Sequence, residues 1–513
     1  MCGIISVFIK YPEKNIKEII ESEQILKNRG PDCNKIIKSP HILGFRRLSI
    51  NDKSEKSMQP FISDNISVLC NGEIFNHKQL EEKYNINCKS LSDCECILHL
   101  YKKLGFKDTI TQLRGDFAII IIDKNKMYFG RDRIGVRPLF LGRTNSNNIA
   151  LASYARVLTK YCKYIEQISP GWGVYDSESE KIYFMNYDFP IISITDSNIQ
   201  TIIQKILTQS VKDRLMSDRP IGCLLSGGLD SSIIVSILCK LLGPNNVRTY
   251  SIGMEGSIDL DHARIVADTL GTEHHEVKFT AEEGFNAIPN VIRDLESYDI
   301  TTIRASVGMW LLAKWISENT NDVVLMSGEG SDELFCGYLY FHYAPNLNAL
   351  QRESLRLVKN LYKYDVLRAD RCVSSHGLEL RVPFLDHELI DTVLNIPPVL
   401  KEPYNGVEKH ILRMSFIDDY LPDQVLWRRK DGMSDGISGK NKKWYEHIQD
   451  FVKNIITNDI YDEDKYPSRE AQYYRLIYNK FFPSYQPKYE YWMPKWVDHG
   501  GDPSGRILEI FNK

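Results

Sequence analysis

The sequence predicts a two-part fold: an α+β sandwich of antiparallel sheets (αββα), followed by an α/β part with a doubly wound parallel sheet. In residues 1–190, short strand-like runs recur between turn residues, with only two helical stretches among them. Beyond residue 220, apolar strand-like runs alternate with helical segments, which is the pattern of a parallel sheet. At 513 residues, the chain is also too long for one ordinary core.

Composition indicates a soluble globular protein and narrows its expected partners. Hydrophobic residues make up 43% of the sequence and charged residues 26%. The net charge of −3 argues against nucleic acid as the main partner, and no apolar run approaches membrane-spanning length. Eleven irregularly spaced cysteines and the lack of a signal peptide favour reduced thiols in the cytoplasm.

The first part contains several strand-like runs, at residues 42–50, 66–70, 117–122, 127–130, 149–153 and 182–187. Helical stretches are predicted near residues 14–27 and 93–104. Ser92 and Glu95 have the spacing of a capping box at the start of the second helix. The two cysteines within it, Cys94 and Cys96, have no second pair at metal-binding spacing and are predicted to be buried.

Residues 188–198 lack periodicity and are predicted to be a linker, so we expect domains over residues 1–190 and 196–513. A helix with an apolar face then begins at Ile199. Strands are predicted at 221–225, 247–253, 274–279 and 323–327, and helices at 260–270, 282–293 and 303–317. Ligands bind beyond the carboxyl ends of the strands in such a sheet.

A glycine-rich loop follows the first of these strands: Ser226-Gly227-Gly228-Leu229-Asp230-Ser231-Ser232. The two glycines permit a sharp turn and close approach of a ligand, and the amides of the loop and first helical turn favour an anion. Asp230 would repel a bare phosphate, so a divalent cation is expected between them. The spacing is not that of a Walker loop. The run resembles the pyrophosphate-binding loop of ATP pyrophosphatases; the alternative is an ordinary strand-to-helix turn.

Cys2 is a candidate nucleophile. The chain begins Met1-Cys2-Gly3-Ile4, so removal of Met1 would give Cys2 both a thiol and a free α-amine. An α-amine has a pKa near about 7.7–8.0, so a fraction is neutral at pH 7. It can therefore act as the built-in base of the nucleophile. Retained Met1 would block this arrangement, and a cysteine at position 2 by chance is the alternative.

Three polar clusters of the first part resemble class II glutamine amidotransferases, the N-terminal-nucleophile glutaminases. They are Arg46-Arg47-Leu48-Ser49-Ile50, Asn71-Gly72-Glu73-Ile74-Phe75-Asn76 and Ser92-Asp93-Cys94-Glu95. Arg29-Gly30-Pro31-Asp32 and Gly130-Arg131-Asp132 also resemble that family. The resemblance implies a catalytic Cys2 and a glutamine site formed by Arg47, Leu48, Ser49, Ile50, Asn51, Asn71, Gly72, Glu73 and Asp93.

Within that site, the resemblance implies that Arg47 pairs with the glutamine α-carboxylate and that Asp93, with Glu73, holds the α-ammonium. Asn71 and the Gly72 amide would form the oxyanion hole, since such groups are the usual donors to a tetrahedral oxyanion. Each residue also has a structural alternative. Asp93 could be favourable charge at a helix start, Arg47 a solvated strand residue, and Asn71-Gly72 a hairpin turn.

The second part carries further motifs in a fixed order. They are Thr301-Thr302-Ile303-Arg304-Ala305-Ser306, Ser327-Gly328-Glu329-Gly330-Ser331-Asp332-Glu333, Arg381-Val382-Pro383-Phe384-Leu385-Asp386, Glu408-Lys409-His410 and Trp427-Arg428-Arg429-Lys430. Together they resemble glutamine-hydrolysing asparagine synthetase, and Asp502-Pro503-Ser504-Gly505-Arg506 extends the resemblance to the end of the chain. The departures are Cys336 in place of an expected glycine and Cys33 in place of an expected aromatic residue.

The resemblance implies an ATP site formed by Leu224, Ser226, Gly227, Gly228, Asp230, Ser231, Ser232, Ile252, Ser327 and Gly328. Asp230 and Asp332 would hold Mg²⁺, a hard cation suited to carboxylates and phosphates. Glu329 would act in forming the acyl-adenylate or in taking a proton from ammonia. Lys430 and Arg304 would offset charge as pyrophosphate leaves, although Lys430 also fits a solvated basic run.

The implied reaction is ATP-dependent synthesis of L-asparagine from L-aspartate with glutamine as nitrogen donor. It would pass through a Cys2 glutamyl thioester and β-aspartyl-AMP, releasing glutamate, AMP and pyrophosphate, with a water-excluding passage for ammonia between the sites. Glutamine, aspartate and ATP are the expected partners, without nucleic acid or membrane, and a homodimer is left open. The alternatives are another adenylating relative, such as a β-lactam synthetase, and a silent glutamine or nucleotide sensor.

Overall fold

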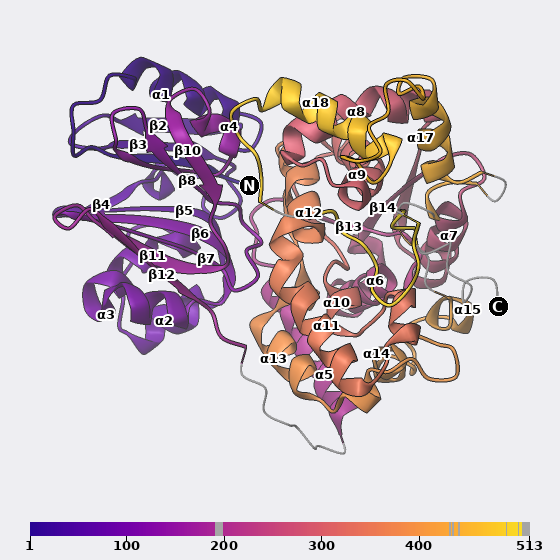
Figure 1. Ribbon diagram of the computed structural model, residues 1–513. Coiled ribbons are helices and arrows are strands. Elements are labelled where there is room, and N and C mark those ends of the chain that lie inside the picture. Colours follow the sequence, from indigo (N-terminus) through magenta and orange to yellow (C-terminus); the bar gives the residue numbers. More distant parts are fainter. Residues whose placement is uncertain are drawn as a thin grey trace.

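The computed structural model describes residues 1–189, 198–429, 432, 436–439, 442–488, 490–500 and 502–504. The chain forms two halves that lie side by side (Figure 1). Two stacked sheets with helices outside them form the first half, and helices surround a parallel sheet in the second (Figure 1). Most of the predicted linker, residues 190–197, lies outside the described residues.

Both sheets of the first half are antiparallel and six-stranded. One has the order β10-β8-β9-β1-β3-β2, with bounds Cys162–Gln167, Phe140–Thr144, Ile149–Ala152, Gly3–Phe8, Ile42–Arg47 and Cys33–Ile37. The other has the order β12-β11-β7-β6-β5-β4, with bounds Lys181–Asn186, Gly171–Asp176, Lys126–Arg131, Gly115–Asp123, Ile66–Ile74 and Phe61–Ser63. Helices α1 (Ile16–Ser22), α4 (Ala155–Leu158), α2 (His77–Lys83) and α3 (Cys96–Gln112) lie outside the sheets. This confirms the predicted αββα sandwich.

Strand β6 explains why the sandwich is continuous with its helical cover. Ala118, Ile120 and Ile122 point into the core between the two sheets. Phe117, Ile119 and Ile121 point the other way and pack with the apolar side chains of α3. Because successive side chains of a strand face opposite sides, a strand buried on both sides reads as an unbroken apolar run, as residues 117–122 do.

The second half is built on a five-stranded parallel sheet of order β15-β14-β13-β16-β17. The bounds are Glu273–Lys278, Arg248–Gly253, Ile221–Leu224, Val324–Met326 and Glu379–Arg381. The central helices are α5 (Ile199–Asp213), α6 (Leu229–Leu242), α7 (Ile258–Leu270), α8 (Ala281–Leu295), α9 (Ile300–Asn319) and α12 (Asp365–Ser374). The predicted α/β class is confirmed; β17, which has charged residues at both ends, was not predicted.

Further helices complete the second half. They are α10 (Ser331–Leu334), α11 (Leu347–Asn360), α13 (His387–Asn395), α14 (His410–Ser415), α15 (Asp423–Leu426), α17 (Trp444–Lys453) and α18 (Arg469–Phe481). Helix α18 crosses the top of the half beside α8 (Figure 1). In the part of the chain that the structure describes, none of the helices combines the length and apolarity needed to cross a membrane.

The predicted capping box at Ser92 and Glu95 is wrong. The Ser92 hydroxyl accepts a hydrogen bond from the Cys94 amide at 3.3 Å, capping a short 3₁₀ turn, Asp93–Glu95. The Glu95 carboxylate turns back and accepts from the amides of Lys89 and Ser90 at 2.9 and 2.8 Å. Satisfying two buried loop amides takes precedence here over the local helix cap.

Buried ion pairs join the two halves. Arg29 and Arg137 of the first half both donate to Asp370 on α12, at 2.7 and 3.2 Å. Arg156 likewise donates to Asp294 on α8 at 2.9 Å. Since each of these charges is desolvated, its partner across the interface is required for stability. The relative placement of the two halves is therefore fixed by charge as well as by apolar packing.

Candidate active sites

Cys2 lies at the entrance to β1, on the inner face of the sandwich. Its side chain packs with the core between the two sheets, and its thiol donates to the Leu48 carbonyl at 3.7 Å. The guanidinium of Arg29 donates to the Cys2 carbonyl at 2.6 Å and so holds the backbone of the nucleophile. Burial raises the pKa of the Cys2 thiol to about 12, so the thiol needs a base to become reactive.

The first amine of the chain lies beside this thiol. With Met1 present, the amine donates to the Leu378 carbonyl at 3.3 Å, and burial lowers its pKa to about 5. Met1 itself is buried in the core, close to Arg29. A chain from which Met1 is removed would carry its amine on Cys2, within reach of the thiol.

Asn71 is the most informative residue of the first half. It is fully buried, and neither atom of its side-chain amide has a hydrogen-bond partner within the described chain. Residues 69 and 71 share a face of β5, and Ala118 is the register partner of Asn71. Leu69 and Ala118 belong to the core against which Cys2 packs, so the unsatisfied amide is directed to the same side of β5 as this core. An orphaned buried donor has a large free-energy cost unless it serves a ligand.

Gly72 is required by the close packing of the sheet. Its φ is 150°, and a Cβ at this position would lie 2.0 Å from the Asp116 carbonyl oxygen. The hairpin alternative for Asn71-Gly72 is wrong, because both residues lie within β5 and pair with β6. Substitution of Gly72 would therefore push β5 away from β6 beside the predicted oxyanion hole.

Glu73 and Asp93 form a pair of buried acids. Asn51 donates its side-chain amide to both carboxylates, at 3.3 Å to Asp93. Burial, together with the Asp93 carboxylate, raises the pKa of Glu73 well above its ordinary value. Burial also raises the pKa of Asp93. The Arg381 guanidinium, 3.7 Å from Glu73, offsets only part of this charge, so the two buried acids form a site that favours a cation of the size of an ammonium group.

Arg47 lies at the end of β3 and is buried. Its guanidinium donates to the Ser54 carbonyl at 2.8 Å, to the Asp52 carbonyl and to the Ser57 hydroxyl. The solvated-strand alternative is therefore wrong. These bonds hold the loop after β3 against the sandwich, and a substrate carboxylate would have to share the guanidinium with them.

The other residues predicted to bind glutamine border the second half. The side chains of Leu48 and Ile50 pack against Val323 and Val324 at the beginning of β16. The Ser49 amide donates to Asp32 at 2.7 Å. The loop that follows Arg47 therefore presents backbone groups to the thiol and apolar side chains to the other half.

In the second half, the glycine-rich loop joins β13 to α6 as predicted. The Ser226 and Ser231 hydroxyls lie 3.1 Å apart, and the Gly228 amide donates to Ser226 at 3.3 Å. Gly227 has a φ of 67°, and a Cβ there would lie 2.4 Å from the Ala263 amide nitrogen of α7. Glycine is thus required where this turn meets the neighbouring helix.

The second glycine loop, after β16, packs directly on the first. A Cβ on Gly328 would lie 2.8 Å from the Ser231 amide nitrogen. A single pocket is lined by predicted residues from both loops and from β13, β14 and α9: Leu224, Ser226, Gly228, Asp230, Ser231, Ile252, Arg304, Ser327, Gly328, Glu329 and Asp332. Ser232 is fully buried and its hydroxyl lacks a partner within the described chain. The two loops at the carboxyl ends of β13 and β16 therefore form one concave site.

Asp230 and Asp332 are brought together from opposite loops. The Lys409 ammonium lies 2.6 Å from a carboxylate oxygen of each. Asp230 also accepts from the Ser331 hydroxyl at 2.7 Å. Two carboxylates that already share one positive charge are close enough to share a bound divalent cation, and their oxygens are ligands that Mg²⁺ accepts.

Glu329 and Arg304 line this pocket within ion pairs. Glu329 accepts from Arg368 at 2.7 Å. Arg304 donates to Glu470 at 2.6 Å and to Asp502 at 2.9 Å, so its charge is already matched by two carboxylates. Lys430 lies outside the described residues, and its predicted role stays a prediction.

The comparisons with known proteins cover both halves. The family described as glutamine amidotransferase domain matches residues 1–172, and the one described as asparagine synthase matches residues 203–356 and 344–496. The asparagine synthetase [glutamine-hydrolyzing] of Gallus gallus is 41% identical, over 100% of this chain and 99% of its own. The chain belongs to the glutamine-hydrolysing asparagine synthetase family.

Other relatives agree with this membership. The asparagine synthetase [glutamine-hydrolyzing] of Homo sapiens is 40% identical over 99% of this chain and 98% of its own. A probable asparagine synthetase [glutamine-hydrolyzing] of Acanthamoeba polyphaga mimivirus is 41% identical over 99% of this chain and 100% of its own. The resemblance inferred from the sequence motifs is confirmed.

Two basic side chains of the pocket in the second half, Lys409 and Arg368, were not predicted as site residues from the sequence. Lys409 and Arg368 each pair with acids that the motifs had singled out, Asp230 and Glu329. The signal for Lys409 was present, because it lies in the motif Glu408-Lys409-His410. Arg368 lies on α12 outside any motif, and only the fold brings it to the pocket.

Proposed function

We propose that this protein makes L-asparagine from L-aspartate and ATP with glutamine as nitrogen donor, releasing glutamate, AMP and pyrophosphate. The observation that carries the proposal is the presence of two different sites on one chain. One has a thiol and the orphaned amide of Asn71 on the same core, and the other has two glycine loops around paired acids. Membership of the glutamine-hydrolysing asparagine synthetase family supports the same reaction.

The first site supports glutamine hydrolysis. With Cys2 as the first residue of the processed chain, its α-amine takes the thiol proton and the sulfur attacks the side-chain carbonyl of glutamine. Asn71 and the Gly72 amide bind the oxyanion that develops. The proton then passes to the departing nitrogen, and ammonia leaves. Water hydrolyses the glutamyl thioester to glutamate, regenerating the thiol.

The acids and Arg47 select glutamine by its two ends. The α-ammonium binds between Glu73 and Asp93, whose raised pKa values reflect their burial. The α-carboxylate binds Arg47 and shares its guanidinium with the loop carbonyls. Leu48, Ser49, Ile50 and Asn51 form the wall between them.

The second site supports adenylation. The aspartate side-chain carboxylate attacks the α-phosphorus of ATP, and pyrophosphate leaves into the loop that contains Ser226, Gly227 and Gly228. Ammonia then attacks the acyl carbon of β-aspartyl-AMP, and AMP leaves. Glu329 accepts the proton lost by the ammonia nitrogen, and Lys430 offsets charge on pyrophosphate. Arg304 would add to this only by leaving Glu470 or Asp502, which match its charge in the structure.

Mg²⁺ fits the acids at this site. Asp230 and Asp332 would hold it, since both already converge on the one cation of Lys409. When bound, Mg²⁺ supplies charge neutralisation at the phosphates. Lys409, which lies on the same two acids, would then be available to a phosphate oxygen, whereas Ser232 is fully buried beneath the loop and would support it from behind.

The proposal assigns residues 1–190 to the glutaminase and 196–513 to the synthetase. Its partners are the three small substrates. We place the reaction in the cytoplasm because all eleven cysteines lie in the described chain as free thiols, as expected of a reducing compartment.

The decisive experiment measures asparagine and AMP formation with glutamine and, separately, with ammonium. Cys2→Ala should lose the glutamine reaction and keep the ammonium reaction, because only the first site uses the thiol. Cys33→Ser, which changes an exposed cysteine, is the matched control and should keep both. Absence of aspartate-dependent AMP release with either nitrogen source in the wild type would refute the proposal.

A further inference from the structure

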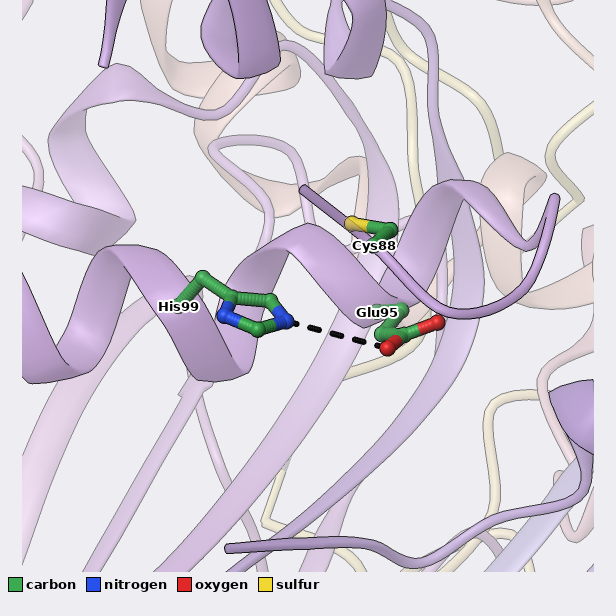
Figure 2. Close-up of side chains that lie close together, drawn as sticks. All are labelled: Cys88, Glu95 and His99. Carbon is green, nitrogen blue, oxygen red and sulfur yellow. Dashed lines mark ion pairs between the residues drawn. The ribbon is translucent and has the colours of Figure 1, made fainter. Parts of the chain in front are cut away.

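Three metal-binding side chains of different types meet beside the predicted glutamine site. Cys88 lies on the loop between α2 and the 3₁₀ turn, Glu95 ends that turn, and His99 lies on the first turns of α3. One ligand atom from each lies within 4.8 Å of the other two. In Figure 2, the imidazole of His99 and the carboxylate of Glu95 face each other, with Cys88 beside them.

The spacing is close to that of a zinc centre. The His99 Nε2 atom lies 3.7 Å from the Glu95 Oε1 atom. With zinc–nitrogen and zinc–oxygen bonds of about 2.0–2.1 Å, the edge of a tetrahedral site is about 3.3 Å. Glu95 and His99 are four residues apart on a helical segment, so this pair is held on one face by backbone geometry. Only small side-chain rotations separate the cluster from tetrahedral coordination.

The imidazole nitrogen has no other use within the described chain. Nε2 of His99 is buried and lacks a hydrogen-bond partner, although the ring as a whole is partly exposed. The Lys89 amide donates to the Glu95 Oε1 atom at 2.9 Å, and the amide and hydroxyl of Ser90 donate to Oε2 at 2.8 and 2.5 Å, which fixes the orientation of the carboxylate. An imidazole, a carboxylate and a thiol together favour zinc over Mg²⁺ or Ca²⁺.

We propose that Cys88, Glu95 and His99 bind one Zn²⁺ ion, with water as the fourth ligand. The Cys88 thiol, which donates to the Glu81 carboxylate at 3.6 Å, would release its proton to solvent when the metal binds. Three protein ligands and one water make a common zinc arrangement. The position of the site, partly open to solvent, gives the ion an entry path.

The metal would restrain the loop that borders the residues predicted to bind glutamine. The Leu91 amide, three residues after Cys88, donates to the Asp52 carboxylate at 2.8 Å. The Asp52 carbonyl in turn accepts from Arg47. Zinc at Cys88 therefore fixes one end of a segment whose other end leads to Asp93. This consequence rests on the proposed function, whereas the metal site itself does not.

The test uses the full-length protein stripped of metal and titrated with Zn²⁺ alone by calorimetry. Replacing a group that only orients a zinc ligand lowers affinity by about 10–100-fold. Cys88→Ser and His99→Gln change proposed ligands themselves, so each should weaken the tightest site by at least about tenfold. Cys33→Ser, at an exposed thiol, is the control and should bind as the wild type does. Equal affinity in the wild type and Cys88→Ser would overturn the proposal.

A second measurement needs no variant. X-ray absorption at the zinc edge of the wild-type complex should give one sulfur ligand and three nitrogen or oxygen ligands. Two or more sulfur ligands, or none, would overturn the assignment. Zn²⁺ should also change KM for glutamine while leaving the ammonium reaction unaltered. A zinc-loaded protein with unchanged glutamine kinetics would remove the proposed link to the loop.

Discussion

Arg29 and Asp370 form a buried ion pair, with Nη1 of Arg29 2.7 Å from Oδ2 of Asp370, although 341 residues separate them. The same guanidinium donates through Nε to the carbonyl of Cys2 at 2.6 Å. A carboxylate on α12 of the second half thus holds the arginine that positions Cys2, the proposed nucleophile of the first half. The Arg-Gly-Pro-Asp motif serves the interface as well as the glutaminase site.

Replacing Asp370 should damage both stability and glutamine use. Asp370→Asn leaves Arg29 buried without its counter-charge and removes one of three carboxylates beside Arg137, which should cost about 3–5 kcal/mol and lower Tm. The glutamine reaction should fall more than the ammonium reaction, because Arg29 holds Cys2. The control is Asp391→Asn, whose partly exposed pair with Arg133 should contribute only about 0–1 kcal/mol. Equal losses in the two variants would contradict the argument.

Asn71→Ala should separate catalysis from stability. Loss of an oxyanion donor should lower kcat of the glutaminase by about 10²–10³-fold, with little change in KM or in the ammonium reaction. Tm should not fall, because the amide has no hydrogen-bond partner to lose in the described structure. Asn76→Ala is the contrasting variant, since Asn76 bonds both Gln112 and Arg114 and should lower Tm instead. Thermal denaturation and steady-state kinetics of both variants test the assignment.

The paired acids predict a pH dependence of glutamine binding. Burial raises the pKa of both Glu73 and Asp93, so they take up protons at a higher pH than ordinary carboxyls, whose pKa is about 4. As pH falls through these raised values, the attraction for the α-ammonium is lost and KM for glutamine should rise. The ionised acids also destabilise the free protein, so unliganded stability from this pair increases as pH falls through the same range.

The measurement is KM for glutamine as a function of pH in the wild type and in Asp93→Asn. The variant should have a high KM at every pH and a flatter profile, because the pair no longer shares a proton. Titration of the Cys2 amine should appear in kcat rather than in KM. A wild-type KM that stays constant down to the ordinary carboxyl range would contradict the assignment of these acids to the ammonium group.

Lys409→Met should convert the paired acids of the second half into a stronger metal site. Asp230 and Asp332 would lose their shared cation, which should cost about 3–5 kcal/mol without metal. Added Mg²⁺ should then raise Tm more in the variant than in the wild type, since binding to the folded state is stabilising. Both synthetase reactions should fall and glutamine hydrolysis should persist. Lys314→Met, at an exposed pair, is the control, and an equal Mg²⁺ response in all three proteins would contradict the prediction.

The features that could be predicted from the sequence are those set by residues close together along the chain. The turn from β13 to α6 could be predicted because an apolar run, two glycines and an apolar helix follow one another directly. The sequence could single out Asn71 and Gly72. It could not predict that the buried Asn71 amide lacks a hydrogen-bond partner within the described chain. That property depends on two sheets stacking, which no local pattern specifies.

The missed features depend on contacts between distant residues. Lys409 lies 179 residues from Asp230, and Arg368 lies 39 residues from Glu329. Strand β17 is three residues long and ends in Glu379 and Arg381, so its apolar signal is too short to recognise. The capping-box prediction at Ser92 failed for a related reason, because the Glu95 carboxylate was drawn to loop amides instead.

The short strand β16 has a consequence for how such a chain can diverge. Val323 and Val324, at its beginning, pack against Leu48 and Ile50 of the glutamine loop, and Ser327 and Gly328 follow its end. The strand spans only about 10 Å at about 3.3 Å per residue. A substitution that changes side-chain volume in β16 should therefore affect both proposed sites at once. The two halves could exchange partners over evolutionary time only if this strand and the loop that covers it changed in step.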